Sequence, residues 1–213
     1  MINGPMNNAA REAILGSIRS HLAASAASDR HVHPVHPDNP VVKSDFKKSI
    51  ESVDGHCIVT TDVTDVLSRI LTDLKPRRIA VSDSPQLQKL LNAMKLVIDE
   101  IEVAPDARDI FRFDVGITTA QAAVAETGTL VLDSTCERHR LVSLVPPVHI
   151  AIVNASAIRE TLSDALALLR KDKEISPAVT FITGPSRTAD IELTLTIGVH
   201  GPQELYVIVD ESN

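Results

Sequence analysis

Residues that could bind or transform a small molecule gather in three short segments of the chain. The first is the run Glu126, Thr127, Gly128 and Thr129. Gly128 permits a positive φ angle or a close approach of the backbone to a ligand. The run therefore predicts a carboxylate, Glu126, that binds or attacks a ligand. The alternative is a glutamate at the end of a helix beside a tight turn.

The second segment follows an apolar run at 178–183 and holds Gly184, Ser186, Arg187, Thr188 and Asp190. Backbone N–H groups after a glycine, two hydroxyls and a guanidinium could hold a carboxylate or a phosphate. The GxxxxGK[ST] spacing of a nucleotide-binding P-loop is absent. We predict a small anion site here, and the alternative is a polar loop with a surface arginine.

The third segment, 198–202, places His200 between glycines. A histidine changes its charge near neutral pH, so His200 is a candidate acid or base. The alternative is a turn histidine that only makes hydrogen bonds. Asp190, Glu192 and His200 do not follow a standard spacing of metal ligands, and we predict no metal site.

Short apolar runs and helical stripes alternate along most of the chain. Strands separated by helices of this length predict a mostly parallel sheet with helices on both faces, and functional loops at the carboxyl ends of its strands. The Ala-rich stretch 118–126 is predicted to be one of the helices. The predicted strands are 56–60, 77–83, 95–103, 113–118, 127–134, 149–153, 178–184 and 204–210, and the predicted helices are 41–55, 61–74, 84–94, 118–126 and 156–171.

The N-terminal part of the chain differs in composition from the rest. Residues 9–24 carry a helical apolar stripe, and 25–40 hold three prolines and three histidines with few large apolar groups. We therefore predict a helix and linker over 1–40, tethered to an α/β domain over 41–213.

Composition excludes several classes of protein. The 213 residues have a net charge of −7 and only five aromatic side chains, which is unlike a nucleic-acid-binding protein. No apolar run is long enough to span a bilayer, and the N-terminus does not resemble a signal peptide. Two cysteines, Cys57 and Cys136, fit a cytoplasmic location and are too few for an iron–sulfur cluster, which takes four.

Four segments taken together resemble a known family. They are 114–134 (DVGITTAQAAVAETGTLVLDS), 140–153 (RLVSLVPPVHIAIV), 184–192 (GPSRTADIE) and 198–202 (GVHGP). In this order and with this spacing they are similar to the LUD domain, and more closely to the lactate-utilisation protein C family. The resemblance covers roughly 41–210.

The resemblance implies a fold similar to the NagB/RpiA/CoA-transferase-like α/β fold. It also implies a place in a three-protein system that oxidises L-lactate to pyruvate, in which the two partner proteins carry iron–sulfur clusters and this chain carries no cofactor. Within that system the chain would be a ligand-binding or accessory subunit that holds a small carboxylate or a phosphorylated ligand. Arg187 would then clamp the carboxylate and His200 would take the hydroxyl proton.

Two alternatives of other classes stay open. Enzymes of the same superfamily use carboxylates as nucleophiles or bases, so the chain could be a stand-alone CoA-transferase-like or sugar-phosphate-isomerase-like enzyme acting through Glu126. It could also be a purely structural or regulatory module that docks through the helix at 9–24. Fold analogy alone does not decide between these functions.

Overall fold

The computed structural model describes residues 8–26, 43–94, 100–170, 177–189, 195–197 and 201–212. The chain divides into two compact units, residues 1–34 and 35–213. The first unit contains one helix, α1 (Asn8–Ala26), on which Ile14 and Ile18 are exposed. All other described elements belong to the second unit.

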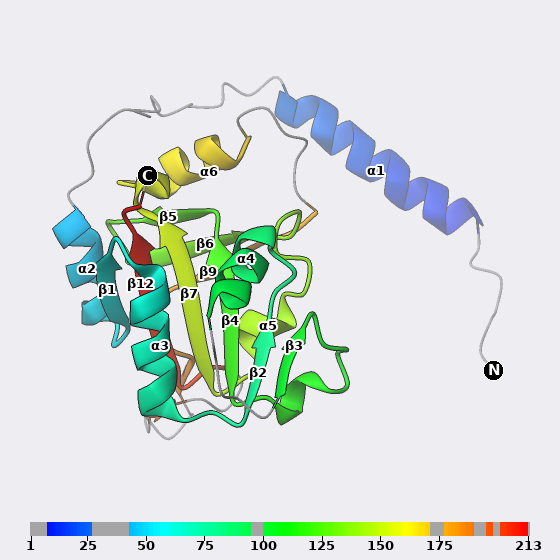
Figure 1. The fold of residues 1–213 in the computed structure, drawn as a ribbon. Helices are drawn as coiled ribbons and strands as arrows, with labels where there is room; N and C mark the ends of the chain where they lie inside the picture. The colour runs from blue at the N-terminus through cyan, green and yellow to red at the C-terminus, as the bar shows by residue number, and fades with distance from the viewer. Residues whose placement is uncertain are drawn as a thin grey trace. The chain divides into compact units, whose positions relative to one another are not determined.

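A six-stranded sheet organises the second unit (Figure 1). Every neighbouring pair of its strands runs in parallel. The inner strands are rich in Ile, Val and Ala and are buried, as expected for a sheet covered on both faces. In spatial order the strands are β1 (His56–Thr60), β12 (Glu204–Asp210), β7 (Val148–Asn154), β4 (Val115–Ala120), β2 (Arg78–Val81) and β3 (Glu100–Val103).

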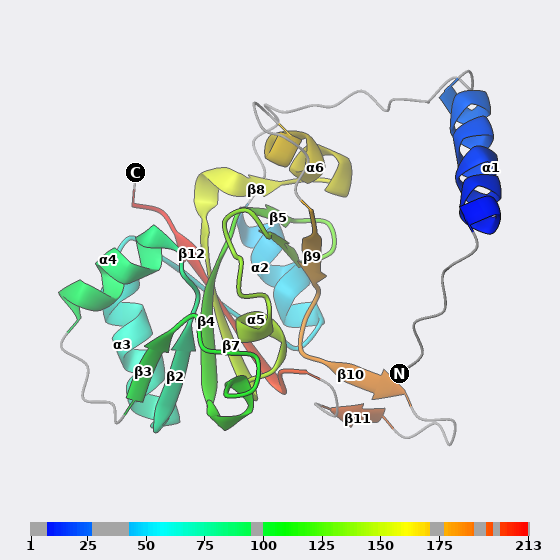
Figure 2. The ribbon, with the colours of Figure 1, turned by 90° about the vertical axis from the view of Figure 1, so that its right-hand side faces the viewer.

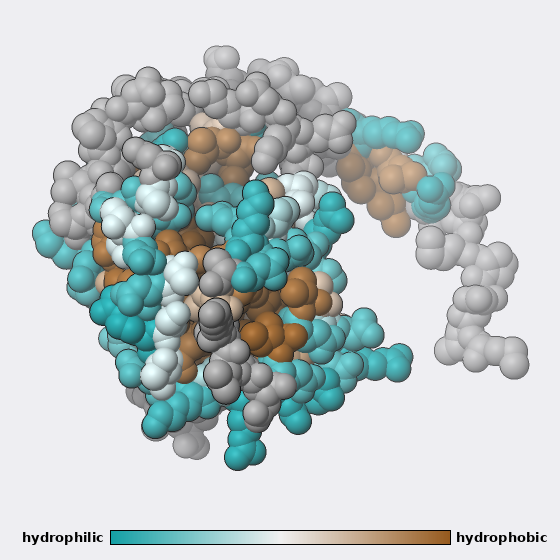
Figure 3. Space-filling model, viewed as in Figure 1, coloured by the Kyte–Doolittle hydropathy of each residue, from teal (hydrophilic) through white to brown (hydrophobic). Residues whose placement is uncertain are grey.

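Helices cover both faces of this sheet (Figure 2). One face carries α3 (Val63–Leu74) and α4 (Pro85–Ala93), and the other carries α2 (Lys43–Ser52) and α5 (Leu141–Leu144). The sequence defines both ends of α3. The Asp62 side chain accepts a hydrogen bond from the Asp65 N–H at the start, and Lys75 takes a left-handed conformation at the end. In Figure 3 hydrophilic residues dominate the outer surface of α3.

A second, smaller sheet lies against the α2 face of the first. It consists of β8 (Ile158–Arg159), β5 (Ala122–Val124), β6 (Thr129–Asp133) and β9 (Val179–Ile182), in that order. Helix α6 (Leu162–Arg170) packs on it through Ala165. Single 3₁₀ turns occur at Ile110–Arg112 and Ala155–Ala157, and a hairpin pairs β10 (Arg187–Ala189) with β11 (Leu195–Ile197).

The predicted α/β class, with a mostly parallel sheet and helices on both faces, is confirmed. The helix predicted over 118–126 is wrong, because β4 continues to Ala120 and β5 follows at Ala122–Val124. Alanine favours a helix locally, but here it lies between two packed layers where only small side chains fit. The helix predicted over 156–171 begins only at Leu162, and residues 95–99 of a predicted strand lie outside the described residues.

Among the described residues, no helix is long and apolar enough to cross a membrane.

Gly116 allows α5 to approach the middle of the sheet. A Cβ atom at this position would lie 1.9 Å from the carbonyl oxygen of Val142. We predict that Gly116→Ala lowers the free energy of unfolding by about 1–3 kcal/mol, because the backbone of α5 must move. Urea denaturation measures the change.

Gly16→Ala is the matched control, since a Cβ at Gly16 meets nothing within 4 Å. Its denaturation midpoint should not fall below that of the wild type, because alanine favours a helix more than glycine does. Equal midpoints for Gly116→Ala and the wild type would show that the close approach is not a constraint.

Candidate functional site

Two of the segments predicted to bind a ligand lie side by side in the structure. The backbone N–H of Ser186 donates to the carbonyl of Pro202 at 2.8 Å, and Gly201 packs against the Ser186 side chain. Together they line a pocket of about 310 Å³, which we call the amino-edge pocket because it lies at the start of β7 and β12. The pocket is also lined by Ser143, Leu144, His149, Phe181–Arg187 and Leu205.

His149 forms the inner wall of the amino-edge pocket. It is the second residue of β7, between Gly116 of β4 and Leu205 of β12, and its side chain is fully buried. Its Nε2 atom lies 2.8 Å from the Thr118 hydroxyl, whereas its Nδ1 atom has no hydrogen-bond partner among the described residues. An unpaired buried nitrogen costs free energy, so its position on a pocket wall points to a ligand.

Burial lowers the pKa of His149 to about 3, so the ring is neutral at pH 7. A neutral imidazole has one N–H donor and one acceptor nitrogen. When Nε2 accepts the Thr118 hydroxyl proton, Nδ1 carries the hydrogen and can donate it to an oxygen atom in the pocket. The pocket therefore offers a directed donor without a positive charge.

A chain of hydroxyl groups connects the first predicted segment to the second. Thr127 and Thr129 lie 2.7 Å apart at their Oγ1 atoms, and Thr129 lies 2.7 Å from Thr183, which lines the pocket. Gly128 has a φ angle of +64° and packs against the backbone of α2 at Ser49. Gly128 is thus needed for a close contact with α2.

Glu126 lies apart from the amino-edge pocket. Glu126 is exposed at the turn between β5 and β6 and is not among the residues that line the pocket. Its backbone N–H donates a hydrogen bond to the carbonyl of Glu160 at 3.1 Å. Among the residues that the structure describes, no base or donor pairs with the Glu126 carboxylate in a way that would activate it.

Arg187 lines the amino-edge pocket, and its guanidinium is paired with the carboxylate of Asp54 after α2. The Arg187 side chain is 37% exposed and that of Asp54 is 72% exposed. An exposed pair of this kind is worth only about 0–1 kcal/mol, so an incoming carboxylate could compete for the guanidinium.

The side chains of three predicted residues lie outside the described part of the structure. His200 and Asp190 lie outside the described residues, and Thr188 is described only as a backbone position in β10. The functional roles predicted for these residues stay predictions, as do those for Glu126, Thr127, Gly128, Thr129, Gly184, Ser186 and Arg187.

The structure adds a residue that sequence reasoning missed and changes the expected location of the site. His149 is not among the residues singled out from the sequence, yet it lines the same pocket as the loops at 183–187 and 201–202. These loops lie at the amino ends of β7 and β12, whereas the expected location was the carboxyl ends. One sequence signal could have identified His149. The pair Pro146–Pro147 precedes it and brings a polar side chain to the start of an apolar strand.

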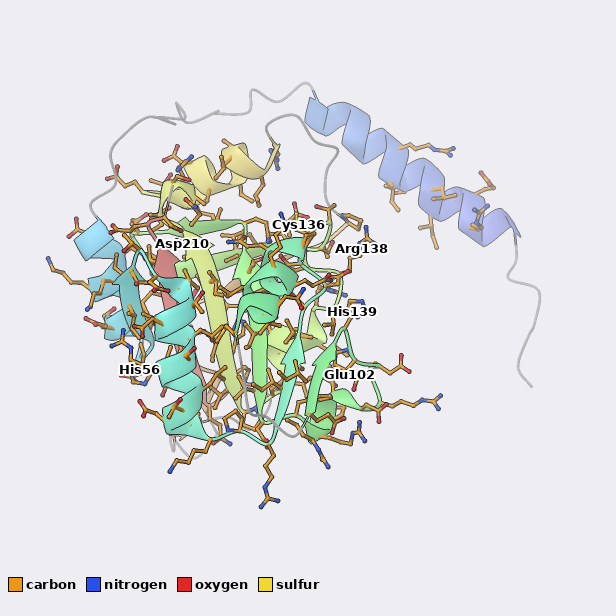
Figure 4. All side chains as sticks on the ribbon, in the orientation of Figure 1. His56, Glu102, Cys136, Arg138, His139 and Asp210 are labelled. Carbon is orange, nitrogen blue, oxygen red and sulfur yellow. The ribbon has the colours of Figure 1, made fainter. Side chains whose placement is uncertain are left out.

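A second pocket lies at the opposite, carboxyl edge of the sheet. It measures about 520 Å³ and is lined by the starts of α3 and α4, by Lys89 and by the ends of β7 and β12. Figure 4 shows Asp210 and Cys136 at this edge and His56 at the other end of the strands. We call this the carboxyl-edge pocket.

A family model for the LUD domain matches residues 44–209, which span the six-stranded sheet up to the penultimate residue of β12 and include every residue that lines the amino-edge pocket. The chain belongs to the LUD domain family. Its resemblance to that family, inferred from four segments, is thereby confirmed.

Named LUD relatives match part of the chain. It is 39% identical over 103 residues to lactate utilization protein C of Bacillus licheniformis, a match that covers 46% of this chain and 43% of the relative. It is 46% identical over 103 residues to lactate utilization protein C 1 of Bacillus mycoides, covering 46% and 44%. The chain thus spans about half the length, or less, of these relatives.

A solved structure shares the LUD fold of this chain. It is the crystal structure of a DUF162 family protein from Deinococcus radiodurans, with a TM-score of 0.58 and 21% sequence identity. The match covers 83% of this chain and 99% of that one.

His149 predicts a pH dependence of stability. Its folded pKa of about 3 lies below the ordinary value of 6.5, so the unfolded chain binds a proton that the folded chain does not. This contribution to the free energy of unfolding is complete above pH 6.5 and decreases as the pH falls toward 3, by up to about 1.4 kcal/mol per pH unit.

His149→Gln keeps a polar side chain beside Thr118 and removes this titration. Urea denaturation between pH 7 and pH 5 should therefore show a shallower decrease for His149→Gln than for the wild type. Parallel curves for the two proteins would contradict the neutral, buried state of His149.

Proposed function

We propose that this chain is a component of a system that oxidises L-lactate to pyruvate. Within that system it acts as a cytoplasmic ligand-binding or accessory subunit, and iron–sulfur partner proteins carry the redox clusters. The names of its relatives support the link to lactate utilisation. The chain has only two cysteines, whereas an iron–sulfur cluster is normally held by four cysteine ligands. This supports the assignment of the redox clusters to the partner proteins.

The observation that carries the ligand-binding role is the unpaired Nδ1 atom of His149 on the wall of the amino-edge pocket. A 2-hydroxy or 2-oxo acid presents oxygen atoms that accept such a hydrogen bond. Arg187 lines the same pocket, and a guanidinium suits a carboxylate. The pocket volume of about 310 Å³ is at the lower end of the range for small-molecule sites, which fits a small acid.

The neutral state of His149 limits what the pocket can do. A histidine with a pKa of about 3 is a weak base, so it orients a ligand and does not remove a hydroxyl proton at pH 7. Binding and positioning, with electron transfer elsewhere, is therefore the role that the geometry supports best.

Ligand binding is tested on the purified chain by calorimetric titration with L-lactate and with pyruvate. We predict that His149→Gln weakens binding roughly 10-fold, the effect of losing one directed hydrogen bond. His139→Gln is the matched control, because His139 is exposed and lies outside the pocket, and its affinity should equal that of the wild type. Equal affinities for the wild type and His149→Gln, or no binding of either acid, would contradict the proposed site.

The subunit role is tested by affinity purification of the tagged chain from its native host grown on L-lactate. We expect iron–sulfur proteins to co-elute, and lactate-dependent dye reduction in the eluate to require this chain. A chain that elutes alone, from a host that still oxidises lactate without it, would contradict the subunit role.

A further inference from the structure

The carboxyl-edge pocket lies on the face of the six-stranded sheet that α3 and α4 cover. Ile152 of β7 and Asp210 at the end of β12 contribute the sheet side of the pocket. On β12, Ile208 packs with α3 and α4 whereas Val209 packs on the opposite face, so the alternation of side chains places Asp210 on the side of α3 and α4. The cavity of about 520 Å³ is large enough for a small-molecule ligand.

Asp210 presents a buried carboxylate to this pocket. The residue is only 8% exposed, and its Oδ1 atom accepts hydrogen bonds from the N–H and the hydroxyl of Ser212. Within the described part of the chain no donor contacts Oδ2 of Asp210, and no lysine, arginine or histidine forms an ion pair with it. Buried carboxylates are normally paired with a positive charge. Asp210 therefore favours a ligand that carries a cationic donor.

The start of α4 presents the opposite preference. Ser84 is the N-cap residue, but its side chain does not cap the helix, and its hydroxyl lies 3.4 Å from that of Thr119. Pro85 has no N–H, and the N–H of Gln86, a pocket residue, has no acceptor among the residues described. Lys89 lies one turn along the same side of α4 and also lines the pocket. An open helix start beside a lysine attracts an anionic group.

The charges of the pocket are not cancelled by the protein itself. Asp62, at the start of α3, is the only other acidic residue of the lining, and it accepts a hydrogen bond from the Asp65 N–H as the cap of its own helix. In the described residues no ion pair joins Asp210 to Lys89, and neither forms one elsewhere. The pocket thus holds two unpaired charges of opposite sign. A ligand that bears an ammonium and a carboxylate group satisfies both.

We propose that the carboxyl-edge pocket binds a free α-amino acid. Its ammonium group pairs with Asp210, and its carboxylate is held by Lys89 and the start of α4. The part of the lining that remains favours an aliphatic side chain on this amino acid, because it consists largely of Val63, Leu90 and Ile152.

The proposed amino-acid site is independent of the lactate site. The amino-edge pocket lies at the other end of the strands, and its residues His149 and Leu205 belong to the other face of the sheet. L-Lactate has no ammonium group, so it lacks the partner that Asp210 requires.

Calorimetric titration of the purified full chain with L-leucine tests the proposal. We expect saturable binding of one L-leucine per chain. Two analogues each lack one of the charges: 4-methylpentanoate has no ammonium group, and 3-methylbutylamine has no carboxylate. Each should bind about 10-fold more weakly than L-leucine, because it leaves one charge of the pocket unpaired.

Two variants remove the matching charges from the protein. Asp210→Asn keeps an oxygen acceptor for Ser212, and it should weaken L-leucine binding about 10-fold without weakening the binding of 4-methylpentanoate. Lys89→Gln changes an exposed side chain, and it should weaken L-leucine binding about 5-fold without weakening the binding of 3-methylbutylamine.

Asp73→Asn is the matched control. Asp73 is an exposed carboxylate in the last turn of α3 and lies outside the pocket, so this variant should bind L-leucine like the wild type.

No saturable binding of L-leucine to the wild type, or equal affinities for L-leucine and both analogues, would overturn the proposal. Equal affinities of the wild type and Asp210→Asn for L-leucine would also overturn it. If circular dichroism shows that Asp210→Asn does not fold, the analogues and Lys89→Gln decide the question on folded protein. None of these outcomes bears on lactate binding, which is measured with variants of His149.

Discussion

The parallel pairing of six covered strands is the constraint on which the rest of the structure depends. Such a sheet has no solvent-facing side, so a polar side chain on an inner strand has to find its partner close to one of the two strand ends. His149 lies near the amino end of β7 and Thr119 near the carboxyl end of β4. The two pockets lie at these two edges of the sheet.

The amino-edge pocket has one physical feature that favours a ligand, a buried polar atom without a partner in the described residues. The unpaired Nδ1 of His149 carries a cost of about 1–3 kcal/mol in the ligand-free chain, and a bound small molecule would recover that cost. The neutral imidazole suits a ligand oxygen.

The fold class followed from the sequence because helical stripes and apolar runs are local signals. The stripe of α3 and the apolar run of β12 identify these elements directly. The stretch 118–126 could not be assigned in this way. Ala122 and Ala123 occupy a strand because the layers on either side leave room only for small side chains, and that constraint arises from distant segments.

The candidate sites were predictable only in part. Ser186 and Arg187 could be singled out because glycine, hydroxyl and guanidinium groups occur together, and the structure places both on a pocket wall. His149 gave no such signal of clustered groups, because it stands alone at the start of an apolar strand. Its significance arises when β4 brings the Thr118 hydroxyl to its Nε2 atom, over a separation of 31 residues in the sequence.

Nitrogen NMR of ¹⁵N-histidine-labelled protein can detect a ligand in the amino-edge pocket at the His149 ring itself. His149→Gln assigns the two ring signals of His149, which at pH 6 should show a neutral imidazole. The account predicts that saturating L-lactate or pyruvate shifts the Nδ1 signal of His149 and leaves that of exposed His139 in place. A charged ring at pH 6, or a His149 spectrum unchanged by either acid, would contradict it.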